Sequence, residues 1–216
     1  IGFCEIDPFC RRVLARHWPE TPVYKDIKDL GDQELQRIKA NVITGGFPCQ
    51  DISWAGKGAG LTGSRSGLWR ELLRAIRVVR PKVAMLENVA ALRWRGMGTV
   101  LSDLAEIGYD SEWDSIPANA VGAIHKRERM YIVAYPCGNG GQGIMPRSLS
   151  RSKEFSWSKN VRRLEDMRER PVIHTPWLCR ADDGVSHRMD RLRGLGNAVV
   201  PGVIWQLGNG AKELLL

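Results

Sequence analysis

The chain of 216 residues contains no long apolar run. Its most continuous apolar stretches, at residues 83–86 and 132–135, fall far short of the roughly 20 residues that a membrane-spanning helix needs. The first residues also lack the charged-then-apolar layout of a signal peptide. The sequence therefore excludes a membrane-spanning protein and gives no indication of secretion, so we expect a cytoplasmic location.

Cysteine is scarce, and the spacing of the cysteines does not indicate disulfide pairs or zinc ligands. The five cysteines, at positions 4, 10, 49, 137 and 179, are odd in number and include no CxxC pair. Neither a disulfide framework nor a zinc site is indicated, and we expect no bound metal. A reducing compartment suits this pattern best.

Positive charge is present in excess and is unevenly distributed. The chain has 32 Lys and Arg against 24 Asp and Glu, a net charge of +8. Residues 125–193 alone hold 15 Lys and Arg against 8 Asp and Glu, which accounts for +7 of that total. Such a segment favours a polyanionic partner, although a solvated basic surface is the simpler alternative.

Strand and helix patterns alternate along the first 136 residues. Asp7 followed by Pro8 predicts a helix start, with Asp as N-cap. Further helices are expected at 32–38, 68–79, 98–107 and 199–215, and strands at 1–6, 23–27, 41–45, 82–86, 110–116 and 129–135. This alternation is typical of an α/β fold with a parallel sheet. Residues 46–67 form a glycine-rich loop that is too long for a simple connector, which favours a functional role.

Four segments combine residues that could carry chemistry. Cys49 follows an apolar strand, where α/β enzymes place ligands, although an isolated cysteine is more often structural. The sequence Glu87-Asn88-Val89 also ends an apolar strand. Residues 125–129 hold four potential cations, and strand alternation places Arg127 and Arg129 on one face. The fourth segment, 191–199, has glycines that allow close backbone approach. Each segment alone has an ordinary structural explanation.

In this order and spacing, the motifs GFPCQ, ENV, RER and GNAV resemble those of the DNA cytosine-5 methyltransferase family, and the resemblance covers nearly the whole chain. It implies a Rossmann-like α/β sheet with helices on both faces and a small irregular basic insert. The implied activity is methyl transfer from S-adenosylmethionine to carbon 5 of cytosine. The target base must leave the DNA stack to reach the protein.

The resemblance also implies roles for five catalytic residues. Cys49, preceded by Pro48, would attack carbon 6 of the cytosine. Glu87 would contact N3 and the amino group and donate a proton, and Arg129 would hold O2 of the base. Arg127 would position a phosphate or the active-site loop. An attacked ring is electron-rich, so a fixed cation and an acid suit this chemistry.

Cofactor and DNA contacts follow from the same resemblance. Glu5 would bind the ribose hydroxyls of S-adenosylmethionine, Ile6 would pack on the adenine, and Asp26 with Ile27 would read the adenine edge. Asn197 and Val199 would complete that pocket. Candidate contacts to double-stranded DNA are Gln50, Ser53 and Arg65 in the glycine-rich loop and Arg151, Arg162 and Arg163 in the basic insert.

One departure concerns the family's first strand and its FxGxG turn, which this sequence does not contain. We expect a fragment of a longer protein, in which the loss of a central strand would leave its two neighbours without a partner. The expected organisation is a catalytic domain at 1–136, a short target-recognition insert at 137–186 and a C-terminal segment at 187–216 that returns to the catalytic domain. We expect a monomer, from a restriction-modification or phage context.

Three alternatives remain open on the sequence alone. A tRNA cytosine-5 methyltransferase shares the motifs. A non-catalytic DNA-binding remnant would explain the absent glycine-rich turn. A different enzyme with a cysteine nucleophile is the weakest of the three, because no histidine is placed by the sequence as a partner for Cys49.

Overall fold

The structure, a computed structural model, describes residues 2–48, 67–121, 123, 125–137 and 197–215. The helices are α1 (Pro8–His17), η1 (Ile27–Asp29), α2 (Asp32–Arg37), α4 (Gly67–Val79), α5 (Leu92–Arg95), α6 (Met97–Glu106), η3 (Ala118–Val121) and α10 (Pro201–Leu215). The strands are β1 (Phe3–Cys4), β2 (Val23–Tyr24), β3 (Val42–Gly46), β4 (Val83–Val89), β5 (Tyr109–Pro117) and β6 (Glu128–Pro136). No helix within these ranges has the length and apolar character that crossing a bilayer requires.

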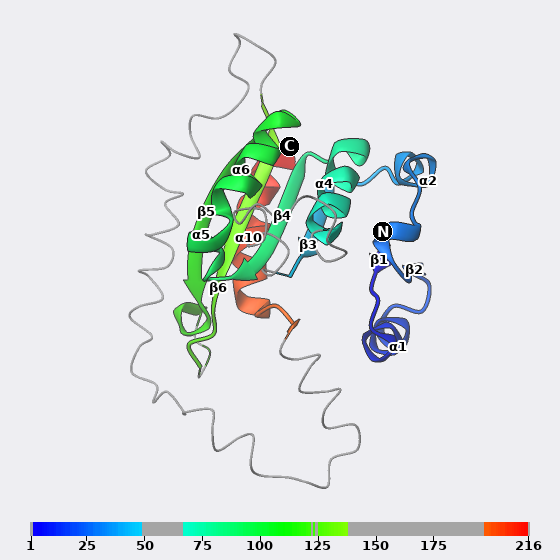
Figure 1. The fold of residues 1–216 in the computed structure, drawn as a ribbon. Coiled ribbons are helices and arrows are strands. Elements are labelled where there is room, and N and C mark those ends of the chain that lie inside the picture. Colours follow the sequence, from blue (N-terminus) through cyan, green and yellow to red (C-terminus); the bar gives the residue numbers. More distant parts are fainter. Residues whose placement is uncertain (1, 49–66, 122, 124, 138–196, 216) are drawn as a thin grey trace, which may run out of the picture.

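The strands form two separate sheets (Figure 1). β1 and β2 pair in parallel, and the other sheet has the order β3-β4-β6-β5. β3 and β4 are parallel as expected, but β6 runs antiparallel to both of its neighbours. The expectation of a wholly parallel sheet is therefore wrong for this half. The connection between β5 and β6, residues 118–127, is too short for the helical crossover that parallel neighbours require.

The break between the sheets falls between β1 and β3. From β1 the chain moves outward to β2 and then returns to β3, which starts the larger sheet. No strand of the described residues lies between them, so β1 and β3 each have one unpaired edge in this part of the chain.

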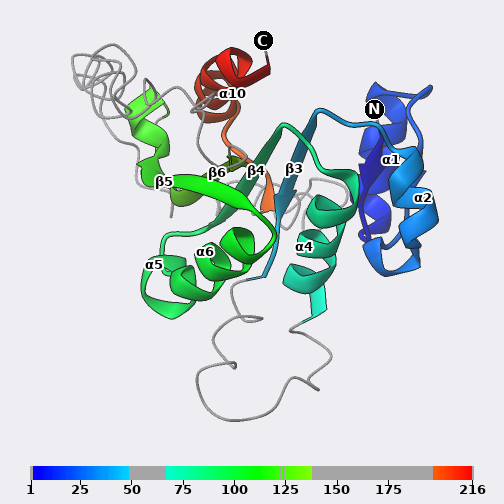
Figure 2. The same cartoon turned by 90° about the horizontal axis from the view of Figure 1, so that it is seen from above.

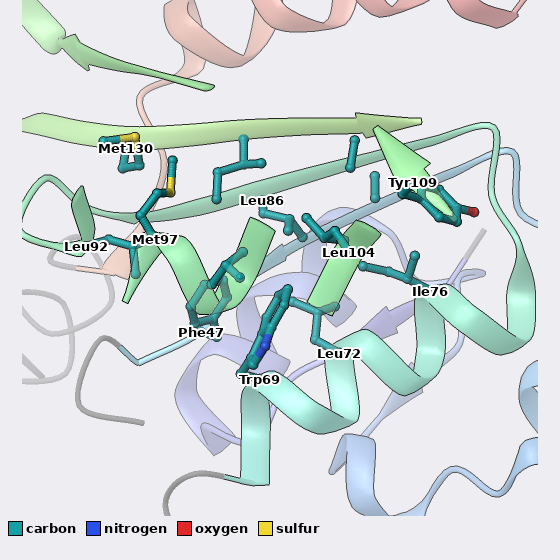
Figure 3. Close-up of a cluster of buried hydrophobic side chains, with 14 residues drawn as sticks. Phe47, Trp69, Leu72, Ile76, Leu86, Leu92, Met97, Leu104, Tyr109 and Met130 are labelled. Carbon is teal, nitrogen blue, oxygen red and sulfur yellow. The ribbon is translucent and has the colours of Figure 1, made fainter. Parts of the chain in front are cut away.

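Helices cover both faces of the four-stranded sheet (Figure 2), as predicted. Helices α4, α5 and α6 lie on one face, and α10 lies on the other. The first face buries a core that includes Trp69, Leu86 and Met130 (Figure 3). On the second face, Val203 and Leu207 of α10 pack with Tyr131 and Val133. The last helix therefore belongs to the body formed by residues before 137.

The smaller sheet is attached to the larger one through α2 and α4. The Asp7 carboxylate caps α1 as predicted, accepting hydrogen bonds from the backbone N–H groups of Phe9 and Cys10. Arg74 of α4 forms an ion pair with Asp32 at 2.6 Å and donates to the Leu30 carbonyl at 2.8 Å. One guanidinium thus fixes the β2–α2 region against α4.

Candidate functional site

The end of β3 leads into the predicted nucleophile. Phe47 is buried against Trp69, with ring centroids 4.8 Å apart. The Trp69 Nε1–H in turn donates to an Asp103 carboxylate oxygen at 2.6 Å. Pro48 is exposed at this end, and Cys49 lies outside the described residues. The core therefore fixes the residue two positions before the cysteine.

Asn88 fixes the same turn from the neighbouring strand. Its side chain is 4% exposed, and its Nδ2 donates to the Phe47 carbonyl at 2.8 Å. Its Oδ1 accepts from the backbone N–H of Val89. No role was predicted for Asn88 within the ENV motif, although a polar residue in an otherwise apolar strand is a signal that could have identified one.

Glu87 and Arg129 meet on the other face of the sheet. In the register of β4 and β6, Glu87 is opposite Tyr131, and Arg129 is opposite Val89. Glu87 and Arg129 are therefore diagonal neighbours on one face, where long side chains can touch. The Arg129 Nε lies 3.1 Å from Glu87 Oε1, and the two side chains are 20% and 18% exposed. The structure thus unites the two residues that were predicted to hold the base.

The environment of Glu87 favours its protonated form. Burial raises the pKa of the Glu87 carboxyl, and the positive charges of Arg129 and then Arg127 oppose this rise. A carboxyl with a raised pKa is suited to donating a proton near neutral pH. Gly46, opposite Glu87 across β3 and β4, leaves room for it, because a Cβ there would lie 3.3 Å from Glu87 Oε2. The sequence did not single out Gly46 for this purpose.

Arg127 reaches the segment before α10. Its Nη2 donates to the carbonyl oxygen of Ala198 at 2.7 Å. Ala198 lies between Asn197 and Val199, two of the predicted cofactor residues. The structure therefore brings residues 197–199 close to the start of β6, the strand that carries Arg129. This contact adds to the predicted role of Arg127 at a phosphate or loop, which stays a prediction.

The remaining predicted cofactor residues lie at the ends of β1 and β2. The Glu5 carboxylate accepts from the backbone N–H of Asp7 at 2.7 Å, and the next side chain, Ile6, is 65% exposed. Asp26 caps η1 by accepting from the Lys28 N–H at 3.0 Å. Ile27 packs against the apolar cores. Asp26 and Ile27 thus have clear structural contacts, and their cofactor roles stay predictions.

Several predicted residues lie outside the described part of the chain. They are Cys49, Gln50, Ser53, Arg65, Arg151, Arg162 and Arg163. Among the described residues, no group of three or more His, Cys, Asp or Glu side chains is placed to hold a metal ion. The described site therefore consists of an acid, two arginines and a fixed turn that leads to a cysteine.

Comparisons with known proteins find similar sequences among type II methyltransferases. The type II methyltransferase M2.BsuMI of Bacillus subtilis is 34% identical over 140 residues, which cover 61% of this chain and 35% of that protein. M.Sau3AI of Staphylococcus aureus is 37% identical over 121 residues, covering 51% and 29%. The chain thus spans about a third of the length of these relatives.

Solved structures and a family model extend the comparison. The Dnmt2 methyltransferase of S. pombe matches with a TM-score of 0.55 at 18% identity, covering 72% of this chain and 48% of that one, which shows a shared fold. The model of the family described as C-5 cytosine-specific DNA methylase matches residues 1–192. Since this match includes the fixed turn, the Glu87–Arg129 pair and most of the chain, the protein belongs to the C-5 cytosine-specific DNA methylase family.

Proposed function

We propose that the protein of which this chain is part transfers a methyl group from S-adenosylmethionine to carbon 5 of a cytosine in double-stranded DNA. The observation that carries this proposal is the Glu87–Arg129 pair, 3.1 Å apart, together with Asn88, which follows Glu87 and binds the carbonyl of Phe47, two positions before Cys49 in the sequence. An acid and a cation in this position can neutralise a ring that gains electrons.

The chemistry follows from the residue types. The Cys49 thiolate forms a bond to carbon 6, and the electron pair of the 5,6 double bond moves into the ring. Glu87 donates a proton to N3, and Arg129 holds O2. S-adenosylmethionine, when bound, would supply the methyl group to carbon 5 and leave as S-adenosylhomocysteine. Loss of the carbon-5 proton to water then restores the 5,6 double bond and expels Cys49 as a thiolate, and N3 returns its proton to Glu87.

The described residues fit part of a cofactor site. The half-buried Glu5 carboxylate lies at the carboxyl end of β1, where open α/β sheets bind ligands, and the exposed Ile6 offers an apolar surface next to it. A carboxylate can accept hydrogen bonds from ribose hydroxyls, and an exposed isoleucine can cover an adenine. Asn197 and Val199 would close the pocket from the α10 side, with Asp26 and Ile27 at the end of β2.

Covalent trapping tests the mechanism. We expect the chain, with S-adenosylmethionine and duplex DNA containing 5-fluorocytosine, to form an adduct that survives denaturing electrophoresis, because fluorine blocks the final elimination. Cys49→Ala should abolish the adduct. Cys137→Ala, which removes an exposed cysteine just beyond β6, should leave it intact. An adduct that persists in Cys49→Ala would overturn the proposal.

The gap between β1 and β3 favours a second candidate, a DNA-binding protein without catalysis. The two candidates differ in cofactor binding, which calorimetry with S-adenosylhomocysteine measures directly. DNA binding without cofactor binding would support the second candidate.

In either case the basic segment 137–186 would supply phosphate contacts, so affinity for DNA should fall steeply as the salt concentration rises. Faster methyl transfer to tRNA than to duplex DNA would instead favour a tRNA substrate.

We further propose the organisation that the sequence indicates. Residues 1–136 would form the catalytic domain, 137–186 the target-recognition insert, and 187–216 the returning C-terminal segment. The contact of α10 with β6 supports this return. Because the relatives are named type II methyltransferases, we propose a role in restriction-modification, and we propose a cytoplasmic monomer.

A further inference from the structure

Arg127 connects two parts of the site that are about 70 residues apart in sequence. Its backbone is held at the start of β6, because the Ala118 N–H donates to the carbonyl oxygens of Lys126 at 3.2 Å and Arg127 at 3.3 Å. Its side chain extends away from the strand to the Ala198 carbonyl, 2.7 Å from Nη2. Because both its backbone and its side chain are hydrogen-bonded, the guanidinium of Arg127 has a defined position relative to β6 and Ala198.

Among the described residues, the segment that Arg127 contacts is also anchored on its C-terminal side, by helix α10. Beyond Val199, helix α10 packs on the sheet through the buried residues Val203 and Leu207. Val199 is 43% exposed, and Asn197 is also exposed. Within the described residues, the hydrogen bond to the Ala198 carbonyl thus connects this exposed segment to the start of β6. The bond is charge-assisted, which makes it stronger than a neutral one.

The same guanidinium lies within electrostatic range of the base side of the site. Arg127 and Glu87 influence each other's ionisation, and Arg129, the ion-pair partner of Glu87, repels Arg127. If the Arg127 side chain moves toward or away from Glu87, its hydrogen bond to the Ala198 carbonyl must therefore change as well. Arg127 therefore interacts both with Glu87, which would contact the cytosine, and with segment 197–199, which would contact the cofactor.

We propose that Arg127 is a positioning residue that holds segment 197–199 in place relative to the Glu87–Arg129 pair, and thereby couples binding at the cofactor side of the site to binding at the cytosine side. The coupling rests on the proposed function, whereas the hold on the segment does not. A phosphate contact alone would need neither the bond to Ala198 nor any effect on the segment.

Hydrogen exchange tests the hold on the segment. We expect Arg127→Ala to speed amide exchange at residues 198–200 about tenfold, the effect of losing one hydrogen bond to a charged group. Arg127→Lys should give a smaller increase, because lysine keeps the charge but lacks the planar fork. The matched control is Lys126→Ala, which removes an exposed positive charge from the adjacent position. Equal exchange in Arg127→Ala and Lys126→Ala would overturn the proposal.

Calorimetry tests the coupling. In the unaltered chain and in Lys126→Ala, cytosine-containing duplex DNA should tighten S-adenosylhomocysteine binding by a factor in the usual range for coupled sites, roughly 5- to 150-fold. The factor should fall toward one in Arg127→Ala and recover partly in Arg127→Lys. An undiminished factor in Arg127→Ala would overturn the coupling. Failure of the unaltered chain to bind the cofactor analogue would instead contradict the proposed function, and the exchange experiment would still decide the positioning role.

Discussion

At the scale of single residues, Glu87 is held between opposing influences. Burial disfavours its charge, whereas Arg129 at 3.1 Å and Arg127 favour it. The net result is a raised pKa, so the folded protein holds the Glu87 proton at a pH where the unfolded chain has released it. A raised pKa suits the proposed role of Glu87 as a proton donor, and it also makes the stability of the protein depend on pH.

Glu87→Gln should change how stability depends on pH. Because the pKa is higher in the folded state, the stability that Glu87 contributes is complete below its unfolded value, near 4.5, and is lost as pH rises through the folded value. Glutamine does not titrate, so the variant does not lose stability in this way. The free energy of unfolding of the variant minus that of the wild type should therefore increase between pH 4.5 and pH 8. Urea denaturation at several pH values measures it. A constant difference across this range would contradict the raised pKa.

Glu87→Gln should also slow methyl transfer, by roughly 10²- to 10⁴-fold, as expected for the loss of a general acid. Single-turnover methylation of duplex DNA by the chain measures the rate. Glu106→Gln, at the end of α6 and exposed, is the control and should leave the rate unchanged.

At the scale of elements, β3 carries two adjacent glycines whose missing side chains serve opposite faces of the sheet. A Cβ on Gly45 would lie 2.9 Å from the buried Leu72 of α4, whereas a Cβ on Gly46 would lie 3.3 Å from the Glu87 carboxylate. One glycine thus lets a helix approach the strand, and the other leaves space for the acid. Alternation along the strand explains the division.

The two glycines should therefore respond differently to alanine. Gly45→Ala should destabilise the protein by about 1–3 kcal/mol, since it overpacks the face that α4 covers. Gly46→Ala should destabilise it less but shift the pKa of Glu87, because it displaces the carboxylate from Arg129. Thermal unfolding and a ¹³C NMR titration of Glu87 separate the two effects. The same response from both variants would contradict this division.

Helix α10 is the other element that the site depends on. Leu207 is 2% exposed against β6, and Leu207→Ala should cost about 2–5 kcal/mol of stability. Trp205 is on the opposite side of the helix and is 65% exposed, so Trp205→Ala should change the free energy of unfolding by less than about 0.5 kcal/mol. Chemical denaturation of the two variants provides the comparison, and similar losses in both would show that α10 does not pack as described.

At the scale of the whole molecule, two sheets are joined by side chains instead of a shared strand. Besides its ion pair with Asp32, Arg74 donates to the carbonyl oxygens of Ile27 and Leu30, and its partner Glu71 on α4 holds it in place at 2.7 Å. These contacts cross from α4 to the η1–α2 region. The relation between the two sheets therefore depends on this guanidinium together with the apolar cluster of Leu30, Leu35 and Ala75.

Arg74→Ala should loosen the smaller sheet without unfolding the larger one. Amide exchange at residues 23–37 should become about tenfold faster, since bonds to a charged donor are lost, while exchange in β4 should stay as it is. Arg77→Ala, an exposed arginine on the same helix, is the control and should leave both regions unaltered. Faster exchange throughout β4 in Arg74→Ala would show that the sheets unfold together.

Much of the fold could be predicted because its signals are local. The cap at Asp7 and Pro8, the apolar run at 83–86 and the helical spacing of 68–79 each depend on neighbouring residues only. The short elements η1, α5 and η3 were not predicted, since a single helical turn has too few residues to show a period. The antiparallel direction of β6 also escaped prediction, because it depends on which strands become neighbours.

The sequence by itself determined the family and the order of most elements, and it predicted the acid and the arginines, since motif order and local periodicity are properties of the chain. Only the tertiary structure decided that Arg129 pairs with Glu87, that Arg127 holds Ala198, and that the sheet divides between β1 and β3. These facts depend on strand register and side-chain direction between segments about 40 to 70 residues apart. No local pattern encodes such distances, because packing of the whole chain sets them.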